Sequence, residues 1–401
     1  MSLFWIILAI LAVVAVAFAL GRGRAVAAVA GDTRLLHSRP VYHGMFAALL
    51  AGIAGFAALI LWPQLARLLN ITDISRVILA AVVVGLSILA AVWAFTRIDA
   101  GFRARNMFER LVRGVLILCS LIAIATTVGI VLSLVFESAE FFRQYPWQKF
   151  FLSTSWAPNF QGNSDLGILP LLWGTLYISA IALLVAVPIG LFAAIYMSEY
   201  ASPRVRGVVK PLIEVLAGIP TIVYGLFALM TVGPMLRDYF AQPLGLGDSG
   251  SSVMTAGLVM GIMIIPFVSS LSDDIINAVP QSLRDGSLGL GATPSETIRS
   301  VVLPAALPGI VGAVLLAASR AIGETMIVVL GAGASARMDL NPFEAMTTIT
   351  VKIVSQLTGD TDFAAPETLV AFALGLTLFV ITLALNIVAL YIVRKYREQY
   401  E

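Results

Sequence analysis

The stretch AASRAIGETMIVV, residues 317–329, places two charged side chains in an otherwise apolar helix. An arginine at the centre of a bilayer costs at least about 2.5–3.5 kcal/mol. The four-residue spacing predicts that Arg320 and Glu324 lie on one face of the helix and partly neutralise each other. They form either a structural ion pair or the lining of a pathway, where the guanidinium offers forked donors to an oxyanion. Because apolar residues often replace a buried ion pair without loss of stability, we favour the pathway.

The composition of the whole chain is that of a membrane protein. Of its 401 residues 59% are hydrophobic and only 12% are charged, and the mean hydropathy is +0.96. Soluble domains carry about 25% charged residues, so we expect an integral membrane protein. The single cysteine, Cys119, excludes an intrachain disulfide and a metal site built from two cysteines. The chain has no phosphate-binding loop that ends in Gly-Lys-Ser or Gly-Lys-Thr, so ATP that drives it would bind another chain.

Nine segments are apolar enough and long enough to cross a membrane, which takes about 20 residues. They predict an all-α polytopic membrane protein. Arg22 and Arg24 follow the first segment and no basic residue precedes its apolar run, so we expect an uncleaved helix rather than a signal peptide. The nine segments are 2–20, 44–62, 77–96, 114–136, 168–197, 211–236, 253–271, 307–331 and 368–393.

Basic residues in the connections between the spans predict the orientation. The alternate connections, beginning with the one after the first span, contain 17 of the 25 lysines and arginines, and the opposite set contains seven. Cytoplasmic connections carry the excess of basic residues. We therefore expect the N-terminus outside the cell and the C-terminus in the cytoplasm, which requires an odd number of spans.

A long cytoplasmic loop, residues 273–306, has a pattern that predicts two short helices. The first begins at Pro280 and stops at a pair of glycines. A capping box of Thr293 and Glu296 opens the second, which runs to Pro304. A helix lying across the cytoplasmic face suits insertion into a groove of another protein. The alternative is an amphipathic segment that rests on the bilayer.

The outer loop 137–167 is rich in aromatic residues, among them Tyr145, Trp147, Phe150 and Trp156. Tyrosine and tryptophan favour the membrane–water interface because their rings are apolar and their tips are polar. We expect an interfacial helix on the outer leaflet, with a docking surface for a soluble partner as the alternative.

The cytoplasmic loop resembles the coupling motif of ABC importer permeases: Glu-Ala-Ala, three residues, Gly, nine residues, then Ile-x-Leu-Pro. An aspartate stands for the glutamate, valine replaces isoleucine, and glycine and serine replace the alanines, which weakens the helix by up to about 1 kcal/mol at the glycine. The resemblance implies that the loop seats in a cleft of an ATPase subunit. The matching positions hold Asp285, Gly286, Ser287, Gly291, Leu303 and Pro304.

The opening stretch carries a more specific resemblance. Its core SRAIGETM is similar to the signature of phosphate-specific ABC permeases of the phosphate transport system, and the Met after Glu-Thr resembles their C-type subunit. LAGIPTIVYGLFAL (216–229) and LPLLWGTLYISAIALLVAVPIGLFAAIYMSEY (169–200) are similar to other parts of these permeases. The resemblance covers about residues 166–395 and places the chain among the binding-protein-dependent transport system inner membrane components.

The resemblance implies a transport site without catalytic residues or a metal. Arg320 and Glu324 would line the translocation path. Gly218 and Pro220 would interrupt a helix, free its carbonyl groups and permit a bend beside a cavity. A purely structural kink explains Gly218 and Pro220 equally well.

The resemblance also implies an architecture and a location. The expected fold is a MetI-like type I ABC importer permease core with an N-terminal extension of three helices. We expect the extension and a basic cytoplasmic linker in residues 1–110, the first core helix and a periplasmic loop in 111–167, and the permease core in 168–401. The expected location is the bacterial inner membrane.

The implied partners are a homologous second permease, two ATPase subunits that bind ATP and Mg, a periplasmic phosphate-binding protein, phosphate and membrane lipid, but no nucleic acid. The chain itself is expected to bind no cofactor. The leading hypothesis is a permease subunit of an ATP-driven importer of inorganic phosphate.

Other functions remain open from the residues alone. Composition and spacing do not distinguish phosphate from molybdate, sulfate or a phosphonate. A second hypothesis is an ion-coupled secondary transporter in which Glu324 carries protons, although the cytoplasmic loop and the lack of an evident repeat argue against it. An intramembrane enzyme is disfavoured because the spans hold no convincing catalytic arrangement, and His37 and His43 lie in a basic, solvated segment.

Overall fold

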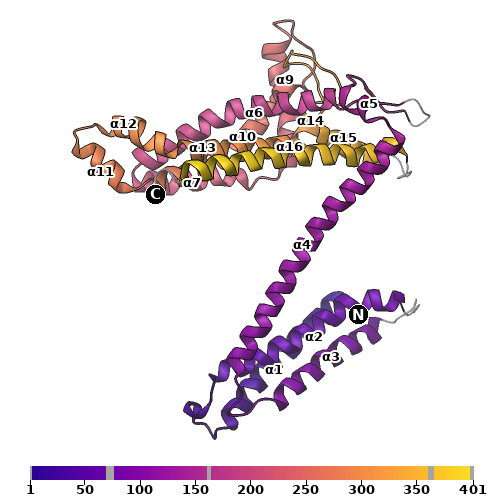
Figure 1. Ribbon diagram of the computed structural model, residues 1–401, viewed down its shortest axis with the longest axis vertical. Coiled ribbons are helices and arrows are strands. Elements are labelled where there is room, and N and C mark those ends of the chain that lie inside the picture. Colours follow the sequence, from indigo (N-terminus) through magenta and orange to yellow (C-terminus); the bar gives the residue numbers. More distant parts are fainter. Residues whose placement is uncertain (1, 69–75, 160–163, 360–364, 398–401) are drawn as a thin grey trace. The chain divides into compact units, whose positions relative to one another are not determined.

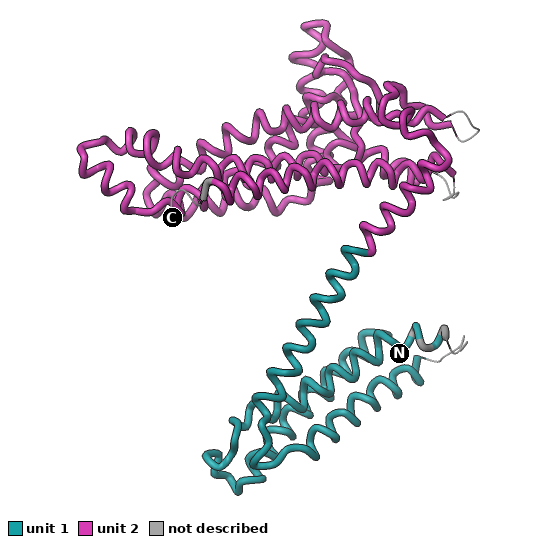
Figure 2. The backbone as a smooth tube through the Cα atoms, in the orientation of Figure 1, with its two compact units in different colours: residues 1–128 teal, residues 129–401 magenta. Residues whose placement is uncertain are grey.

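The computed structural model describes residues 2–68, 76–159, 164–359 and 365–397, and these are mostly helical (Figure 1). Eight of their helices are long and apolar enough to cross a membrane, and a pair of helices bent by 86° is a ninth candidate. The predicted polytopic helical fold is therefore confirmed. By its contacts the chain divides into two compact units, Met1–Val128 and Gly129–Glu401 (Figure 2). The predicted domain boundaries after residues 110 and 167 stay predictions.

Unit 1 is a bundle of three long helices and the start of a fourth. A Cβ at Gly44 would lie 2.7 Å from the carbonyl oxygen of Phe18, so α1 and α2 are in close contact there. Ser87 of α3 donates a hydrogen bond to the Ala51 carbonyl of α2 at 2.9 Å. Close approach at small residues and interhelical hydrogen bonds hold membrane helices together. The elements are α1 (Leu3–Ala27), η1 (Thr33–Leu35), α2 (Pro40–Leu68), α3 (Arg76–Thr96) and the first part of α4 (Ala104–Gln144).

The connections α1–α2 and α3–α4 meet at one end of unit 1, where the His37 amide donates to the Ala100 carbonyl at 3.1 Å. The expectation that His43 is solvated is wrong, because its side chain is fully buried. The reason is that α2 already begins at Pro40, which puts His43 in its first turn, with its ring centroid 5.9 Å from that of Phe102.

Unit 2 is built around α10, of which a larger share is buried than of any other candidate span in the described chain. Its helices α6, α10, α13 and α16 run side by side (Figure 1). The longer elements of the unit are α6 (Leu169–Ile195), α7 (Pro203–Ala217), α8 (Thr221–Phe227), α10 (Val253–Asn277), α11 (Gln281–Gly289), α13 (Leu303–Ile322), α15 (Ile349–Gly359) and α16 (Pro366–Arg397). The shorter ones are α5 (Trp147–Leu152), β1 (Trp156–Ala157), β2 (Asp165–Leu166), α9 (Gly233–Leu236), α12 (Pro294–Thr297), α14 (Met326–Gly331) and the π-helical turns η2 (Tyr196–Tyr200), η3 (Ala228–Val232), η4 (Arg237–Ala241) and η5 (Ile298–Val302).

Two glycines spaced by four on α10 bring α6 into direct contact with it. A Cβ at Gly257 would lie 2.6 Å from Cγ2 and 2.8 Å from Cβ of Ile181. A Cβ at Gly261 would lie 2.9 Å from Cβ of Val185. Spacing small residues by four is a recurrent way to pack two membrane helices closely.

The sixth predicted span, 211–236, is not one continuous helix, and this expectation is corrected. Helix α7 ends at the cap residue Gly218 and α8 begins after Pro220, with a bend of 86° between them. Proline lacks the amide that would continue the helix. The Tyr224 hydroxyl donates to the Leu216 carbonyl at 2.8 Å and satisfies one of the acceptors left at the break. The predicted interruption at Gly218 and Pro220 is therefore present.

The second helix of the cytoplasmic loop also differs from the prediction. The capping box of Thr293 and Glu296 is present, but the helix does not stop at Pro304. It continues through a π-helical turn into α13, so that one candidate span runs from Pro294 to Ile322. A π-helical turn just before Pro304 shifts the hydrogen-bond register and tolerates the missing proline amide.

Several aromatic residues of the outer loop are buried inside unit 2. Tyr145, Phe150 and Trp156 are buried in a cluster with residues of α6 and α16. Trp147 remains exposed on the short helix α5, and the expectation of an interfacial helix stays a prediction. Residues 160–163 of this loop lie outside the described part of the chain.

We predict that Gly257→Ala destabilises the protein by about 1–3 kcal/mol, because the new methyl group overlaps the Cβ of Ile181, which cannot move without moving its backbone. Thermal unfolding of the purified chain in detergent measures the effect. Gly286→Ala is the control, since no atom lies within 4 Å of its added Cβ and alanine favours the helix. Equal unfolding temperatures for the Gly257 variant and the parent would contradict the packing described for α6 and α10.

Candidate functional site

Arg320 and Glu324 lie at a break between two helices. Helix α13 ends at Ile322, Gly323 is its cap residue, and α14 begins only at Met326. The predicted single span 307–331 is thus interrupted immediately after the Arg320 turn. Where a helix break lies within a membrane, lipid cannot satisfy the backbone groups it leaves, so protein groups must bind them.

The carboxylate of Glu324 binds the backbone at this break. Its Oε1 accepts hydrogen bonds from the amides of Met326 at 3.0 Å and Ile327 at 3.4 Å. The expectation that Glu324 pairs with Arg320 on one helical face is therefore wrong. The four-residue rule needs a continuous helix, and this helix stops between the two residues.

Arg320 is exposed on this chain and has no ion-pair partner among the residues that the structure describes. Its Cζ lies 5.7 Å from the ring centroid of Phe267 on α10, a cation–π contact. Next to it, Ser319 donates to the amide oxygen of Asn386 on α16 at 3.0 Å. The guanidinium therefore keeps its forked donors available to an anion.

The break predicted at Gly218 and Pro220 and the unpredicted break after Ile322 belong to one region. Helix α8, which follows Pro220, packs on α14: a Cβ at Gly225 would lie 2.8 Å from the carbonyl oxygen of Met326. Helix α15 also contacts this region, because the Thr350 hydroxyl donates to the Glu324 carbonyl at 2.9 Å. Sequence analysis did not predict α15.

Lys352 is on α15, which is not one of the candidate spans. Burial lowers the pKa of its amino group, and its Nζ donates to a loop carbonyl.

The predicted coupling residues are placed around one exposed turn. Asp285 and Gly286 are exposed on α11, and Asp285 accepts from Gln281 at 3.0 Å. Gly291 has φ of +92°, a conformation that favours glycine, and forms the turn between α11 and α12. Leu290 beside it is 92% exposed. Leu283 and Leu288 of the same hairpin are also exposed, and together the three leucines are a candidate contact for another protein.

The remaining coupling residues hold the turn to the bundle. The Ser287 hydroxyl lies 2.9 Å from that of Thr297, which joins α11 to α12. Leu303 packs on a buried cluster that includes Val302 and Ala306, whereas Pro304 is exposed. The loop is therefore a rigid hairpin of short helices on the end of α13.

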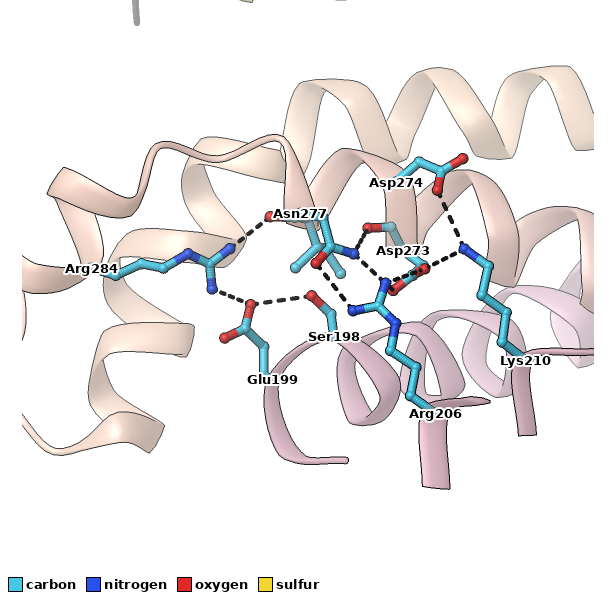
Figure 3. A network of polar contacts seen from close by, with 9 residues as sticks. Ser198, Glu199, Arg206, Lys210, Asp273, Asp274, Asn277 and Arg284 are labelled. Atoms are coloured by element: carbon cyan, nitrogen blue, oxygen red, sulfur yellow. Dashed lines mark hydrogen bonds and ion pairs between the residues drawn. The ribbon is translucent and has the colours of Figure 1, made fainter. Parts of the chain in front are cut away.

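An ionic network that sequence analysis missed lies at the same end of the bundle (Figure 3). Asp273 on α10 is fully buried. Its carboxylate accepts from Arg206 at 2.9 and 3.0 Å, from Lys210 at 2.8 Å and from Asn277 at 2.9 Å. The signal in the sequence was a pair of aspartates directly after an apolar span, matched by basic residues four apart at 206 and 210.

A second ion pair of the network binds α11 itself. Arg284 donates to the carboxylate of Glu199 in η2, and also to the Ile276 carbonyl at 2.7 Å. Both side chains of the pair are largely buried. Figure 3 shows that Ser198 also donates to Glu199, while Arg284 reaches α10 through the Ile276 carbonyl, one turn from Asp273. The network thus joins the coupling helix to the ends of α6, α7 and α10.

Comparison with known proteins shows to which family the chain belongs. The family described as binding-protein-dependent transport system inner membrane component matches residues 186–398. The chain belongs to this family. A second family, described as phosphate ATP-binding cassette transporter, matches residues 7–82, which include the second span and parts of the first and third.

Individual relatives agree with the assignment. The chain is 32% identical to the probable ABC transporter permease protein YqgH of Bacillus subtilis over 71% of this chain and 91% of that protein. It is 38% identical to the phosphate transport system permease protein PstC 1 of Mycobacterium tuberculosis over 61% of this chain and 81% of that protein. It is 32% identical to the PstC protein of Haemophilus influenzae over 73% and 96%. The chain is thus a multi-span permease subunit of an ABC transporter.

A solved structure of the MetNI methionine ABC transporter in an inward facing conformation is 18% identical and covers 57% of this permease and 95% of that chain, with a TM-score of 0.44.

We predict that Asp273→Asn destabilises the permease by about 1–3 kcal/mol, because Arg206 and Lys210 lose their shared charge partner but retain partial access to water. Thermal unfolding in detergent measures the change. Asp274→Asn is the matched control, since that side chain is 67% exposed and its ion pair to Lys210 contributes little. If both variants unfold at the same temperature, the buried network does not stabilise this end of the bundle.

Proposed function

We propose that this permease imports inorganic phosphate across the bacterial inner membrane. It would form the path with a homologous second permease, receive phosphate from a periplasmic binding protein, and be driven by two ATPase subunits that hold ATP and Mg. The relatives named as phosphate transport permeases support the substrate. The excess of basic residues in alternate connections supports a periplasmic N-terminus and a cytoplasmic C-terminus.

The observation that carries the proposal is a guanidinium without an ion-pair partner in the described chain, placed beside a helix break. Arg320 offers planar, forked donors that match the oxygens of a phosphate. Glu324 does not neutralise it, because its carboxylate is bound to backbone amides. An unneutralised cation in a membrane is costly, and a passing anion compensates that cost for as long as it is bound.

The path would open and close at the paired helix breaks. Helix α8 begins at a break and continues through π-helical turns to Ala241, whereas α14 is short, begins at a break and packs on α8, so α14 can turn without bending a long helix. Breaks of this kind are tolerated in membranes where they line a cavity. Alternating access would expose Arg320 first to one side of the membrane and then to the other.

Energy would enter through the exposed turn around Gly291. ATP binding would draw the two ATPase subunits together and carry α11 with them. Because Arg284 ties α11 to Glu199 and α12 runs directly into α13, the movement would reach Arg320 at the far end of that helix.

We predict that Arg320→Ala lowers uptake of radioactive phosphate about ten- to hundredfold, which is the loss expected for a charge-assisted, forked hydrogen bond. Uptake is measured in cells or proteoliposomes that contain the complete transporter, with sulfate and molybdate as competing anions. The control is Arg143→Ala, which removes an exposed arginine of α4. Uptake at the parental rate by the Arg320 variant, with normal assembly, would refute the assigned role. Stronger competition by sulfate or molybdate than by phosphate would instead refute the substrate.

We predict that Leu290→Asp releases the ATPase subunits, because a charge at the tip of the coupling turn cannot enter an apolar cleft without a partner. Co-purification of the ATPase with the tagged permease measures binding, with at least about a tenfold loss expected. Leu340→Asp, in the segment between α14 and α15, is the control because Leu340 is 75% exposed. Full retention of the ATPase by the Leu290 variant would show that docking does not use this turn.

A further inference from the structure

An apolar groove of about 680 Å³ lies between α1 and α3 of unit 1. Every side chain that lines it is apolar, among them Val16 and Leu20 from α1 and Val92 and Phe95 from α3. On α1 the lining residues follow one face and approach the C-terminal end of the helix. The groove is thus formed by two candidate membrane spans and points toward the arginine-rich end of the unit.

Arg24 stands at the end of this groove. It follows the lining residue Leu20 by four positions and so lies one turn further along the same face of α1. Its Cζ lies 4.5 Å from the ring centroid of Phe95, and its Nε donates to the Ile98 carbonyl at 3.3 Å. Helix α3 and the turn that follows it therefore hold the guanidinium in place, and in the described part of the chain its two terminal nitrogens have no ion-pair partner.

The surroundings of Arg24 are strongly basic. The segments 21–43 and 97–113, which meet at this end of unit 1, contain nine arginines and three acidic residues. All nine arginines are exposed. Such a surface beside an apolar groove is complementary to a molecule that has a negative head and a long apolar tail.

We propose that the groove binds an anionic phospholipid, with an acyl chain between α1 and α3 and the headgroup phosphate on Arg24. Basic pockets at the ends of membrane helices on the cytoplasmic side commonly bind acidic headgroups. A transmembrane helix of a partner would fill the apolar groove equally well, but it would leave the guanidinium at its end without an anion. The charge at the groove end therefore favours a lipid. The site is independent of the substrate proposed for the permease.

Helix geometry supplies a matched control for the headgroup. Arg22 is also exposed and lies two residues earlier on α1, so its side chain is about 200° away around the helix and faces away from the groove. Arg24→Gln and Arg22→Gln change the net charge equally. A specific site loses the lipid only in the first variant, whereas a general basic surface loses it equally in both.

A second pair of variants tests the groove itself. Ala12 lines the groove and is exposed, so Ala12→Phe fills the space without disturbing the buried core. Ala15 is exposed on the same helix but does not line the groove, and Ala15→Phe is the control.

The experiment is native mass spectrometry of the full-length permease, delipidated in detergent and titrated with phosphatidylglycerol or phosphatidylcholine. We expect tight binding of one phosphatidylglycerol, about fivefold weaker binding for Arg24→Gln, and no change for Arg22→Gln. Ala12→Phe should lower the affinity for phosphatidylglycerol further, and Ala15→Phe should not. Equal losses for the two arginine variants, equal affinities for the two lipids, or unchanged binding by Ala12→Phe would each overturn the proposal. Loss of a co-purifying protein from Ala12→Phe with lipid binding intact would assign the groove to a partner helix.

Discussion

The hydrogen bonds from the Met326 and Ile327 amides to the carboxylate of Glu324 are the interactions on which the proposed site depends. A helix that stops inside a membrane exposes amides that lipid cannot satisfy. Gly323 stops α13, and Glu324 supplies the acceptor for the first amides of α14. Because the Glu324 carboxylate binds these amides, it does not serve as a counter-charge for Arg320. The break also frees α14 to pack on α8, which itself begins at a break, so two interruptions distant in sequence form one region of the permease.

A second constraint is the continuous helix that connects the cytoplasmic turn with Arg320. The helix that begins at the capping box continues for 29 residues to Ile322, a length of about 40 Å. Near its beginning, the ion pair of Arg284 and Glu199 fixes α11 to the bundle, and the buried carboxylate of Asp273 binds α7 to α10. A rigid element with an ionic anchor at one end and the charged break at the other is suited to transmit displacement. All the residues named in this connection belong to unit 2.

Much of this could be predicted from sequence wherever the signal is local. Apolar length gave the spans, the pattern of Thr293 and Glu296 gave a helix start, and Gly218 with Pro220 gave a break. The failures have a common cause, since each depends on a contact distant in sequence or on where a helix stops. The i, i+4 rule paired Arg320 with Glu324 because Gly323 alone does not reveal a helix end. Asp273 was assigned to a loop because its burial depends on basic residues more than 60 positions away.

A double-mutant cycle between Arg320 and Glu324 shows whether the two side chains form an ion pair. The permease carrying Arg320→Gln, Glu324→Gln or both is purified in detergent, and the free energy of unfolding is measured for all four proteins. Because Glu324 binds backbone amides and not the guanidinium, we expect the two changes to be additive within about 0.5 kcal/mol. A coupling energy of about 1–3 kcal/mol would mean that the two side chains form an ion pair, and Arg320 would then not be the free cation that the proposed transport site requires.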